Sequence, residues 1–178
     1  MRYGNELSLK TWDDAKRYLG ALGSGWLYRG HGDAAWALQS TLERNKGLLT
    51  ASAAEDVVLR RFKRNAHGYL QPHHVPNDTL EWLALMQHHG APTRLLDWTA
   101  SPYVAAFFAF EEATGTAGTC AIWAVDGSWC RLQGAQVIRE KRSADIAALY
   151  AEGPTTWETE QFDEIFGSKP LPVVMPVE

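Results

Sequence analysis

The segment from Ser101 to Ala113, SPYVAAFFAFEEA, constrains the fold of this chain more than any other. Serine followed by proline is a strong helix start, because the serine caps the helix and proline fits its first position. The large apolar side chains that follow, from Tyr103 to Phe110, fall on more than one face of that helix. We therefore expect the helix to be buried, with other elements packed around it.

Patterns elsewhere predict a mixture of helices and strands. Helical spacing or a capping residue predicts three further helices, over residues 12–23, 53–67 and 79–89. Apolar runs between turn signals predict three strands, over residues 25–30, 118–126 and 171–177, the last of them at an edge. A length of 178 residues suits one domain, and the sequence contains no linker or repeat. The chain is expected to form a single α+β domain over residues 1–178.

Charge and hydropathy argue against two classes of partner. The net charge of −4 at pH 7 argues against an extended basic surface that binds nucleic acid electrostatically. The basic run from Arg60 to His67 is a local exception, which we interpret as the solvated face of a helix. No apolar stretch approaches the ~20 residues of a membrane span, and the amino end lacks a signal peptide. A cytoplasmic protein without a membrane partner is expected.

The histidine pairs do not predict a metal site. His88 and His89 are adjacent on a predicted helix, where neighbouring side chains point about 100° apart. They cannot easily ligate one ion, and the HExxH spacing of a helical zinc site is absent. We therefore expect no metal cofactor.

Two short polar segments are candidates for binding an anion. In YRGH, which begins at Tyr28, Gly30 permits close approach of a ligand. The guanidinium of Arg29 offers a planar fork for phosphate or carboxylate, although a structural salt bridge would also explain it. Thr99 and Ser101 stand at the amino end of the apolar helix, where free N–H groups and the helix dipole favour an anion. Capping alone would explain Ser101 but would not require Thr99.

Two longer segments resemble a known family. They read YRGHGDAAWALQSTLER and LALMQHHGAPTRLLDWTASPYVAAFFAF. Both are similar to the FRG domain of bacterial and phage proteins, named for a Phe-Arg-Gly motif, over roughly residues 26–125. That motif falls on Tyr28, Arg29 and Gly30, with tyrosine in place of phenylalanine. The other matched positions are Leu38, Leu42, Arg44, Gln87, His88, Gly90, Pro92, Thr93, Arg94, Leu95, Leu96, Asp97, Trp98, Thr99, Ser101, Pro102, Ala105 and Phe108.

The order of these motifs is more distantly similar to that of ADP-ribosyltransferases. This resemblance implies an α+β fold with a mixed, mainly antiparallel sheet and packed helices, and NAD as the substrate. Arg29 would hold the pyrophosphate of NAD, while Thr99 and Ser101 would shape the nicotinamide pocket. The resemblance implies five further residues that would help to bind NAD, namely Tyr28, Gly30, His31, Arg94 and Asp97.

A later glutamate completes the site in such enzymes. The candidates here are Glu158, Glu160 and Glu164 in TWETEQFDEIF, with Glu160 and Glu164 assigned as catalytic. Cleavage of the nicotinamide–ribose bond develops oxocarbenium character, which a nearby carboxylate stabilises without a metal.

Two classes of function stay open on these grounds. The first is an NAD-using transferase, acting on a protein or nucleic-acid acceptor, or an NAD-cleaving toxin or phage-defence effector. The second is a non-catalytic module that senses a nucleotide or other ligand or binds a protein, in which Arg94 and Asp97 pair internally to hold their loop. A nucleic-acid enzyme is the remaining alternative. FRG domains often continue past a strand like that of residues 171–177, so we expect either a minimal domain or one whose C-terminal part is truncated.

Overall fold

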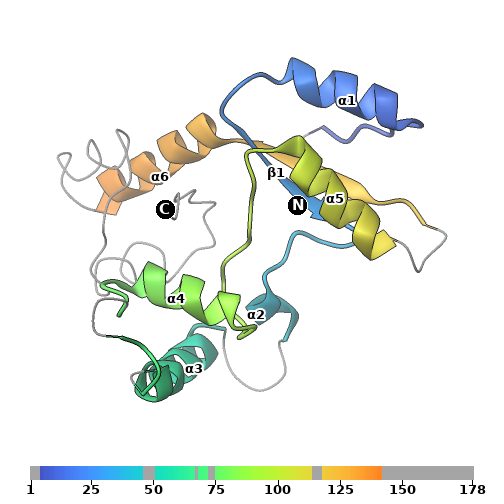
Figure 1. The fold of residues 1–178 in the computed structure, drawn as a ribbon. Coiled ribbons are helices and arrows are strands. Elements are labelled where there is room, and N and C mark those ends of the chain that lie inside the picture. The colour runs from blue at the N-terminus through green and yellow to red at the C-terminus, as the bar shows by residue number, and fades with distance from the viewer. Residues whose placement is uncertain (1–4, 46–50, 67, 72–74, 114–117, 142–178) are drawn as a thin grey trace. The chain divides into compact units, whose positions relative to one another are not determined.

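The computed structural model describes residues 5–45, 51–66, 68–71, 75–113 and 118–141. Within these residues the fold is α+β, with six helices and a two-stranded antiparallel sheet (Figure 1). The elements are α1 (Trp12–Ala21), β1 (Trp26–His31), α2 (Thr41–Arg44), α3 (Ala51–Ala66), α4 (Thr79–His88), α5 (Pro102–Ala113), β2 (Ala121–Asp126) and α6 (Gly127–Lys141). They belong to two compact units, one of residues 1–34 and 98–128 and the other of residues 35–97 and 129–178.

Most of the predicted elements are confirmed. The four predicted helices correspond to α1, α3, α4 and α5, and the first two predicted strands correspond to β1 and β2. The predicted last strand, residues 171–177, lies outside the described residues. The sequence patterns missed two helices, the short α2 and the longer α6.

The first unit is built around β1. This strand pairs with β2 in an antiparallel register that sets Trp26 opposite Asp126 and His31 opposite Ala121. An isolated antiparallel bridge between Tyr28 and Thr99 gives β1 a further neighbour. α5 packs on both strands, and Figure 1 shows it lying along them. β1 is therefore the element that the other parts of this unit share.

The expectation that α5 is buried is wrong for most of its surface. Its buried residues are small, namely Ala105, Ala106 and Ala109. Its large apolar side chains are each 43–63% exposed, and they are Tyr103, Val104, Phe107, Phe108 and Phe110. A small sheet covers only one face of a helix, so an apolar pattern on several faces leaves the others exposed.

The buried face of α5 consists of alanines because β1 comes very close to the helix. A Cβ atom added to Gly30 would overlap the carbonyl oxygen of Ala105 and would lie 2.7 Å from the backbone nitrogen of Ala109. Only small side chains fit between two backbones at this separation. The larger residues of α5 therefore point away from β1, and the Trp12 ring of α1 contacts Tyr103 and Phe110 edge-on.

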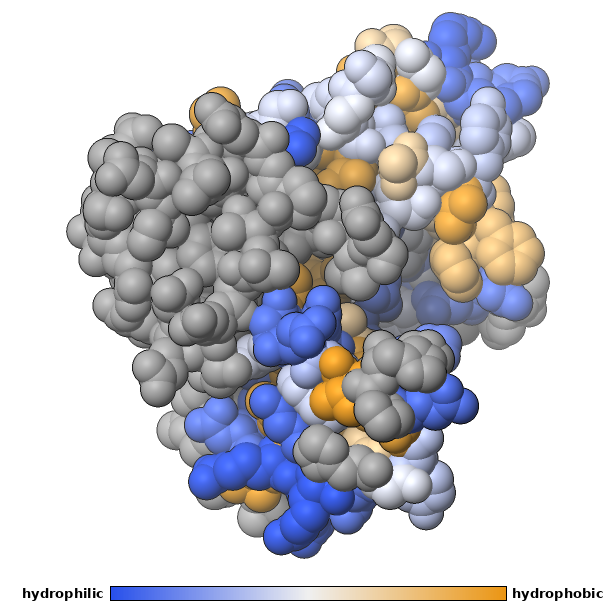
Figure 2. Space-filling view, turned by 60° about the vertical axis from the view of Figure 1, so that its left-hand side comes forward, coloured by the Kyte–Doolittle hydropathy of each residue, from blue (hydrophilic) through white to orange (hydrophobic). Residues whose placement is uncertain are grey.

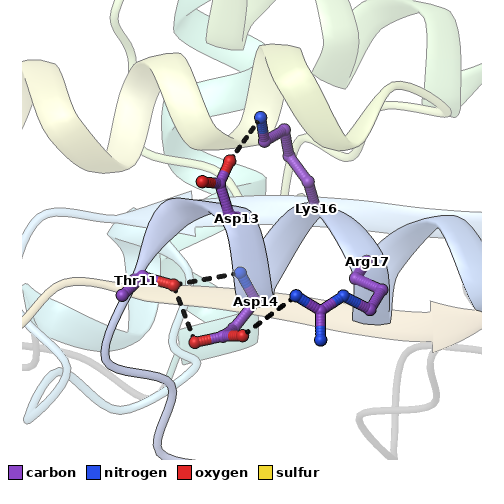
Figure 3. Close-up of polar contacts among 5 residues, drawn as sticks. All are labelled: Thr11, Asp13, Asp14, Lys16 and Arg17. Carbon is purple, nitrogen blue, oxygen red and sulfur yellow. Dashed lines mark hydrogen bonds and ion pairs between the residues drawn. The ribbon is translucent and has the colours of Figure 1, made fainter.

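α1 begins at a polar cap and carries two ion pairs, which Figure 3 shows together. The Thr11 hydroxyl accepts a hydrogen bond from the backbone N–H of Asp14 at 3.1 Å and so caps the helix. Lys16 pairs with Asp13 at 2.7 Å, and Arg17 pairs with Asp14 at 3.5 Å. The hydrogen bond from Lys16 lowers the pKa of the Asp13 carboxyl, and the same contact raises the pKa of Lys16. Exposed pairs of this kind add little to stability.

The second unit is a cluster of helices. α3 packs on α4, and α2 packs on α3. The core of this unit contains Leu59, Trp82, Leu83 and Met86, together with Ala135 of α6. Its buried apolar side chains come from both α3 and α4, so neither helix could bury its own apolar face alone.

The ends of α4 follow from its sequence. Asp78 caps the first turn by accepting the N–H of Glu81 at 2.8 Å. Gly90 follows the cap residue His89 and adopts a φ of +77°, a value that glycine reaches without steric cost. The N–H groups of Gly90 and Ala91 then return to carbonyl groups of the last turn at 2.9 and 3.0 Å. This double return closes the helix and starts the loop that follows.

The predicted solvated face is confirmed for the three arginines of α3, whereas His67, at the end of the predicted run, lies outside the described residues. Arg60, Arg61 and Arg64 are exposed, whereas Lys63 lies over the ring of Trp82 at 5.3 Å from its centroid. The lower part of Figure 2, at the height of α3 in Figure 1, is largely hydrophilic. Among the residues that the structure describes, no helix is long and apolar enough to cross a membrane.

Candidate functional site

Alternation along β1 separates its side chains into two sets. Tyr28 and Gly30 lie on the side of the strand that faces α5, since Tyr28 packs with Ala105 and Gly30 approaches the same helix. Successive side chains of a strand point to opposite faces, so Arg29 and His31 lie together on the other side. The candidate motif YRGH therefore divides into residues that hold α5 and residues that are directed away from it.

Arg29 and His31 form a polar cluster with Trp123 of β2. The Nε–H of Arg29 is directed at Nε2 of His31 at 3.3 Å, and the indole N–H of Trp123 is directed at Nδ1 at 3.0 Å. The two rings meet edge-on at a centroid distance of 5.9 Å. His31 is only 5% exposed, so its imidazole is a buried polar group. Trp123 stands opposite Arg29 in the sheet register.

Sequence reasoning missed Trp123. The signal that could have found it is the pairing of β1 with β2, which places position 123 opposite position 29. The sequence predicted both strands but gave no register for them, and a tryptophan in a strand is usually assigned to packing.

Thr99 and Ser101 lie next to β1 and form the turn that starts α5. The backbone of Thr99 exchanges two hydrogen bonds with Tyr28, at 2.7 and 2.9 Å. The Thr99 hydroxyl accepts the N–H of Ser101 at 3.1 Å, and the Ser101 hydroxyl accepts the N–H of Val104 at 3.4 Å. Local hydrogen bonding therefore accounts for both hydroxyls, including that of Thr99, which capping alone was not expected to require.

Tyr28 and Gly30 have structural roles, because both lie where β1 packs on α5. Tyr28 is 3% exposed in the core of the first unit, and burial raises the pKa of its phenol. The next glycine, Gly32, is equally confined, because its N–H donates to the carboxylate of Glu112 at 3.2 Å. A Cβ atom on Gly32 would overlap the side chain of Glu112. Glu112 of α5 is thus a carboxylate of the first unit that the sequence did not single out.

Arg94 and Asp97 belong to the second unit, where both help to fix the loop after α4. The buried carboxylate of Glu55 accepts the backbone N–H of Arg94 at 3.0 Å and forms an ion pair with the Arg94 guanidinium. Asp97 accepts a hydrogen bond from Gln87 at 2.5 Å. These contacts join Arg94 to Glu55 and Asp97 to Gln87, so the loop is held internally, while the pairing of Arg94 with Asp97 stays a prediction.

The remaining predicted site residues are not described by the structure. Glu158, Glu160 and Glu164 all lie outside the described residues. The described part of the chain contains no group of three or more His, Cys, Asp or Glu residues that could hold a metal ion. The site residues that the structure brings together in one unit are Tyr28, Arg29, Gly30, His31, Thr99 and Ser101.

The segment that carries these residues matches one protein family. Residues 24–117, more than half of the 178-residue chain, match the FRG domain. No curated protein and no solved structure matches the chain. The matched range contains β1, the Thr99–Ser101 turn and α5, whereas Trp123 lies beyond it. The chain belongs to the FRG domain family.

Proposed function

We propose that this FRG-domain chain binds NAD or ADP-ribose through Arg29 and acts on NAD as an ADP-ribosyltransferase-like enzyme. The Tyr28–Thr99 bridge carries the proposal, because it joins the strand of Arg29 to the Thr99–Ser101 turn within one unit. An ADP-ribosyltransferase-like site needs these two segments side by side, one for the pyrophosphate and one for the nicotinamide.

The chemistry of Arg29 suits a pyrophosphate. A guanidinium carries five N–H donors in a planar fork, and the Nε–H of Arg29 is directed at His31. Bonds from a guanidinium to phosphate oxygens are charge-assisted and often paired, which makes arginine a common phosphate-binding residue. On this proposal Arg29 binds the pyrophosphate, and His31 lies directly beside its guanidinium.

The chemical step needs a carboxylate near the ribose. Departure of nicotinamide leaves an oxocarbenium-like ribose, whose positive charge a carboxylate stabilises. We assign this role to Glu160 or Glu164. Water or an acceptor group of a protein or nucleic acid then attacks the anomeric carbon.

A non-catalytic sensing module is the second candidate. It is favoured by the hydroxyls of Thr99 and Ser101, which both bind backbone N–H groups of the turn. In this alternative the first unit binds a nucleotide without cleaving it, and the loop of Arg94 serves only the second unit.

Calorimetric titration with NAD and with ADP-ribose, followed by mass spectrometry for released nicotinamide, separates the two candidates. We expect Arg29→Ala to weaken binding by ~10-fold or more, since it removes charge-assisted hydrogen bonds. Arg17→Ala is the matched control, because it removes an exposed arginine from the same unit without touching β1.

Each outcome has one reading. Nicotinamide release that Arg29→Ala abolishes supports the enzyme, and a modified acceptor would then distinguish a transferase from an NAD-cleaving toxin or defence effector. Binding without release supports the sensing module. Equal binding by wild type and Arg29→Ala would contradict the role of Arg29 in both candidates.

A further inference from the structure

His31 has an N–H donor directed at each of its two ring nitrogens. The indole N–H of Trp123 reaches Nδ1 at 3.0 Å, and the Nε–H of Arg29 reaches Nε2 at 3.3 Å. A neutral imidazole accepts at one nitrogen and donates at the other. While His31 is neutral, only one of these two contacts is therefore a hydrogen bond to a lone pair.

Of the two donors, Trp123 is the one that binds the lone pair of the neutral His31 ring, at Nδ1. Its contact is the shorter one, and an indole has a single N–H, which only donates. Arg29 has five N–H donors and can direct others elsewhere. Turning the imidazole over would place a carbon atom against the indole N–H, so the Trp123 bond also fixes the orientation of the ring.

We propose that Trp123 holds His31 in the tautomer with its proton on Nε2, so that His31 and Arg29 donate together to one phosphate oxygen. The second half of this inference rests on the proposed function of the site. Trp123 is a positioning residue, because it acts through His31. Its place in the register opposite Arg29 keeps both donors on the same face of the sheet.

The geometry of the two donors selects an anionic oxygen. With Nε2 protonated, two N–H groups meet at nitrogens only 3.3 Å apart, and one of them carries a positive charge. An oxygen to one side of this pair can lie within the usual ~2.7–3.0 Å of both nitrogens. A phosphate oxygen satisfies both donors and the charge, whereas a third donor would be repelled. The expected ligand is therefore a phosphate ester such as the pyrophosphate of ADP-ribose.

The tautomer is measured directly by ¹⁵N NMR of the histidine rings, with His31→Gln used to assign the His31 signals. In the wild-type protein at neutral pH, we expect a protonated Nε2 and an unprotonated Nδ1. In Trp123→Phe, Arg29 becomes the donor that claims Nε2, so we expect the proton to move to Nδ1. A wild-type His31 protonated at Nδ1 would overturn the inference, whatever the protein binds.

The two-donor clamp is tested by titration with ADP-ribose, with adenosine as the probe that lacks phosphate. We expect Trp123→Phe to weaken ADP-ribose binding by ~10-fold, since one hydrogen bond to a charged oxygen is lost. Trp26→Phe, on the same sheet, is the matched control and should bind like wild type. In a His31→Gln background, Trp123→Phe should have no further effect on affinity, whereas a merely structural Trp123 would lower it again.

The outcomes keep this inference separate from the proposed function. If ADP-ribose binds with unchanged affinity to Trp123→Phe, the clamp is wrong while the proposed function stands. If wild type binds neither ADP-ribose nor NAD, the proposed function and the clamp are both wrong, and the NMR result alone decides the role of Trp123.

Discussion

Gly30 is a residue at which one added methyl group would collide with the backbone of another element. In Gly30→Ala the new Cβ would overlap the carbonyl oxygen of Ala105 and lie 2.7 Å from the nitrogen of Ala109. These are backbone atoms, so α5 itself must shift. Overpacking of this kind costs about 1–3 kcal/mol or more. We expect a loss of that size in the free energy of unfolding, measured by urea denaturation.

Gly20→Ala is the control for this substitution. Gly20 lies inside α1, and a Cβ there meets no atom within 4 Å. Alanine is the better helix former, so this variant should gain about 0.5–1 kcal/mol. Equal stability of the two variants would contradict the close approach of β1 and α5.

The side chain of Arg94 either stabilises the fold by pairing with Glu55 or binds the ligand, and its substitution distinguishes these two roles. Glu55 is 2% exposed and Arg94 is 24% exposed at the side chain, so Arg94→Leu leaves a buried carboxylate without its cation. Breaking a buried pair costs about 3–5 kcal/mol, and the partial exposure of Arg94 favours the lower value. The double variant with Glu55→Leu should lose less than the sum of the single losses. Thermal denaturation of all four proteins measures this cycle.

Unchanged stability together with lost NAD binding would instead give Arg94 a role in binding the ligand. An Arg94→Leu protein that melts like wild type but no longer binds NAD would show that its pairing with Glu55 contributes little to the fold.

At the scale of the element, the face of α5 that contributes most to stability is the one with the smallest side chains. Ala109 is fully buried, so Ala109→Leu would force α5 away from β1 and cost about 1–3 kcal/mol. Phe107 is 58% exposed, so Phe107→Ala should cost less than about 1 kcal/mol. Chemical denaturation of the two variants checks this order. A larger loss for Phe107→Ala would restore the buried helix that the sequence predicted.

The starts and ends of the elements could be predicted because they depend on local chemistry. Thr11, Asp78 and Ser101 each bind a backbone N–H within three residues of themselves, and Gly90 ends α4 through its own φ. Capping residues and helix-ending glycines act within a few positions, so a short stretch of sequence contains all the residues involved. The family resemblance was found for the same reason, since its long motif is continuous.

What the sequence could not predict depends on contacts between distant segments. Glu55 and Arg94 are 39 positions apart, and Trp123 reaches His31 across 92 positions. The buried face of α5 depends on how closely β1 approaches, which its own hydrophobic pattern does not encode. Residues that serve the candidate site by such contacts, Trp123 above all, could be named only once the register of the sheet was known.

At the scale of the whole molecule, the two units should respond separately to a local change. The element pairs in contact include β1 with β2 and α5 with β1 in the first unit, and α3 with α4 in the second. Cooperative units of this kind open together in hydrogen exchange. We expect Gly30→Ala to speed exchange throughout β1, β2 and α5 and to leave α3 and α4 unchanged, as measured by mass spectrometry. Faster exchange in all five elements would indicate one cooperative unit.

The first unit is assembled from two stretches of chain, which affects how the protein is made. His31 pairs with Ala121, and the 90 residues from Gly32 to Ala121 take the ribosome on the order of 5–20 s to add. During that interval the apolar strand of β1 has been synthesised without the partner that will cover its edge. Unpaired strand edges of this kind promote aggregation. The yield of soluble protein should therefore depend on translation speed between these two positions and on chaperones that bind the waiting strand.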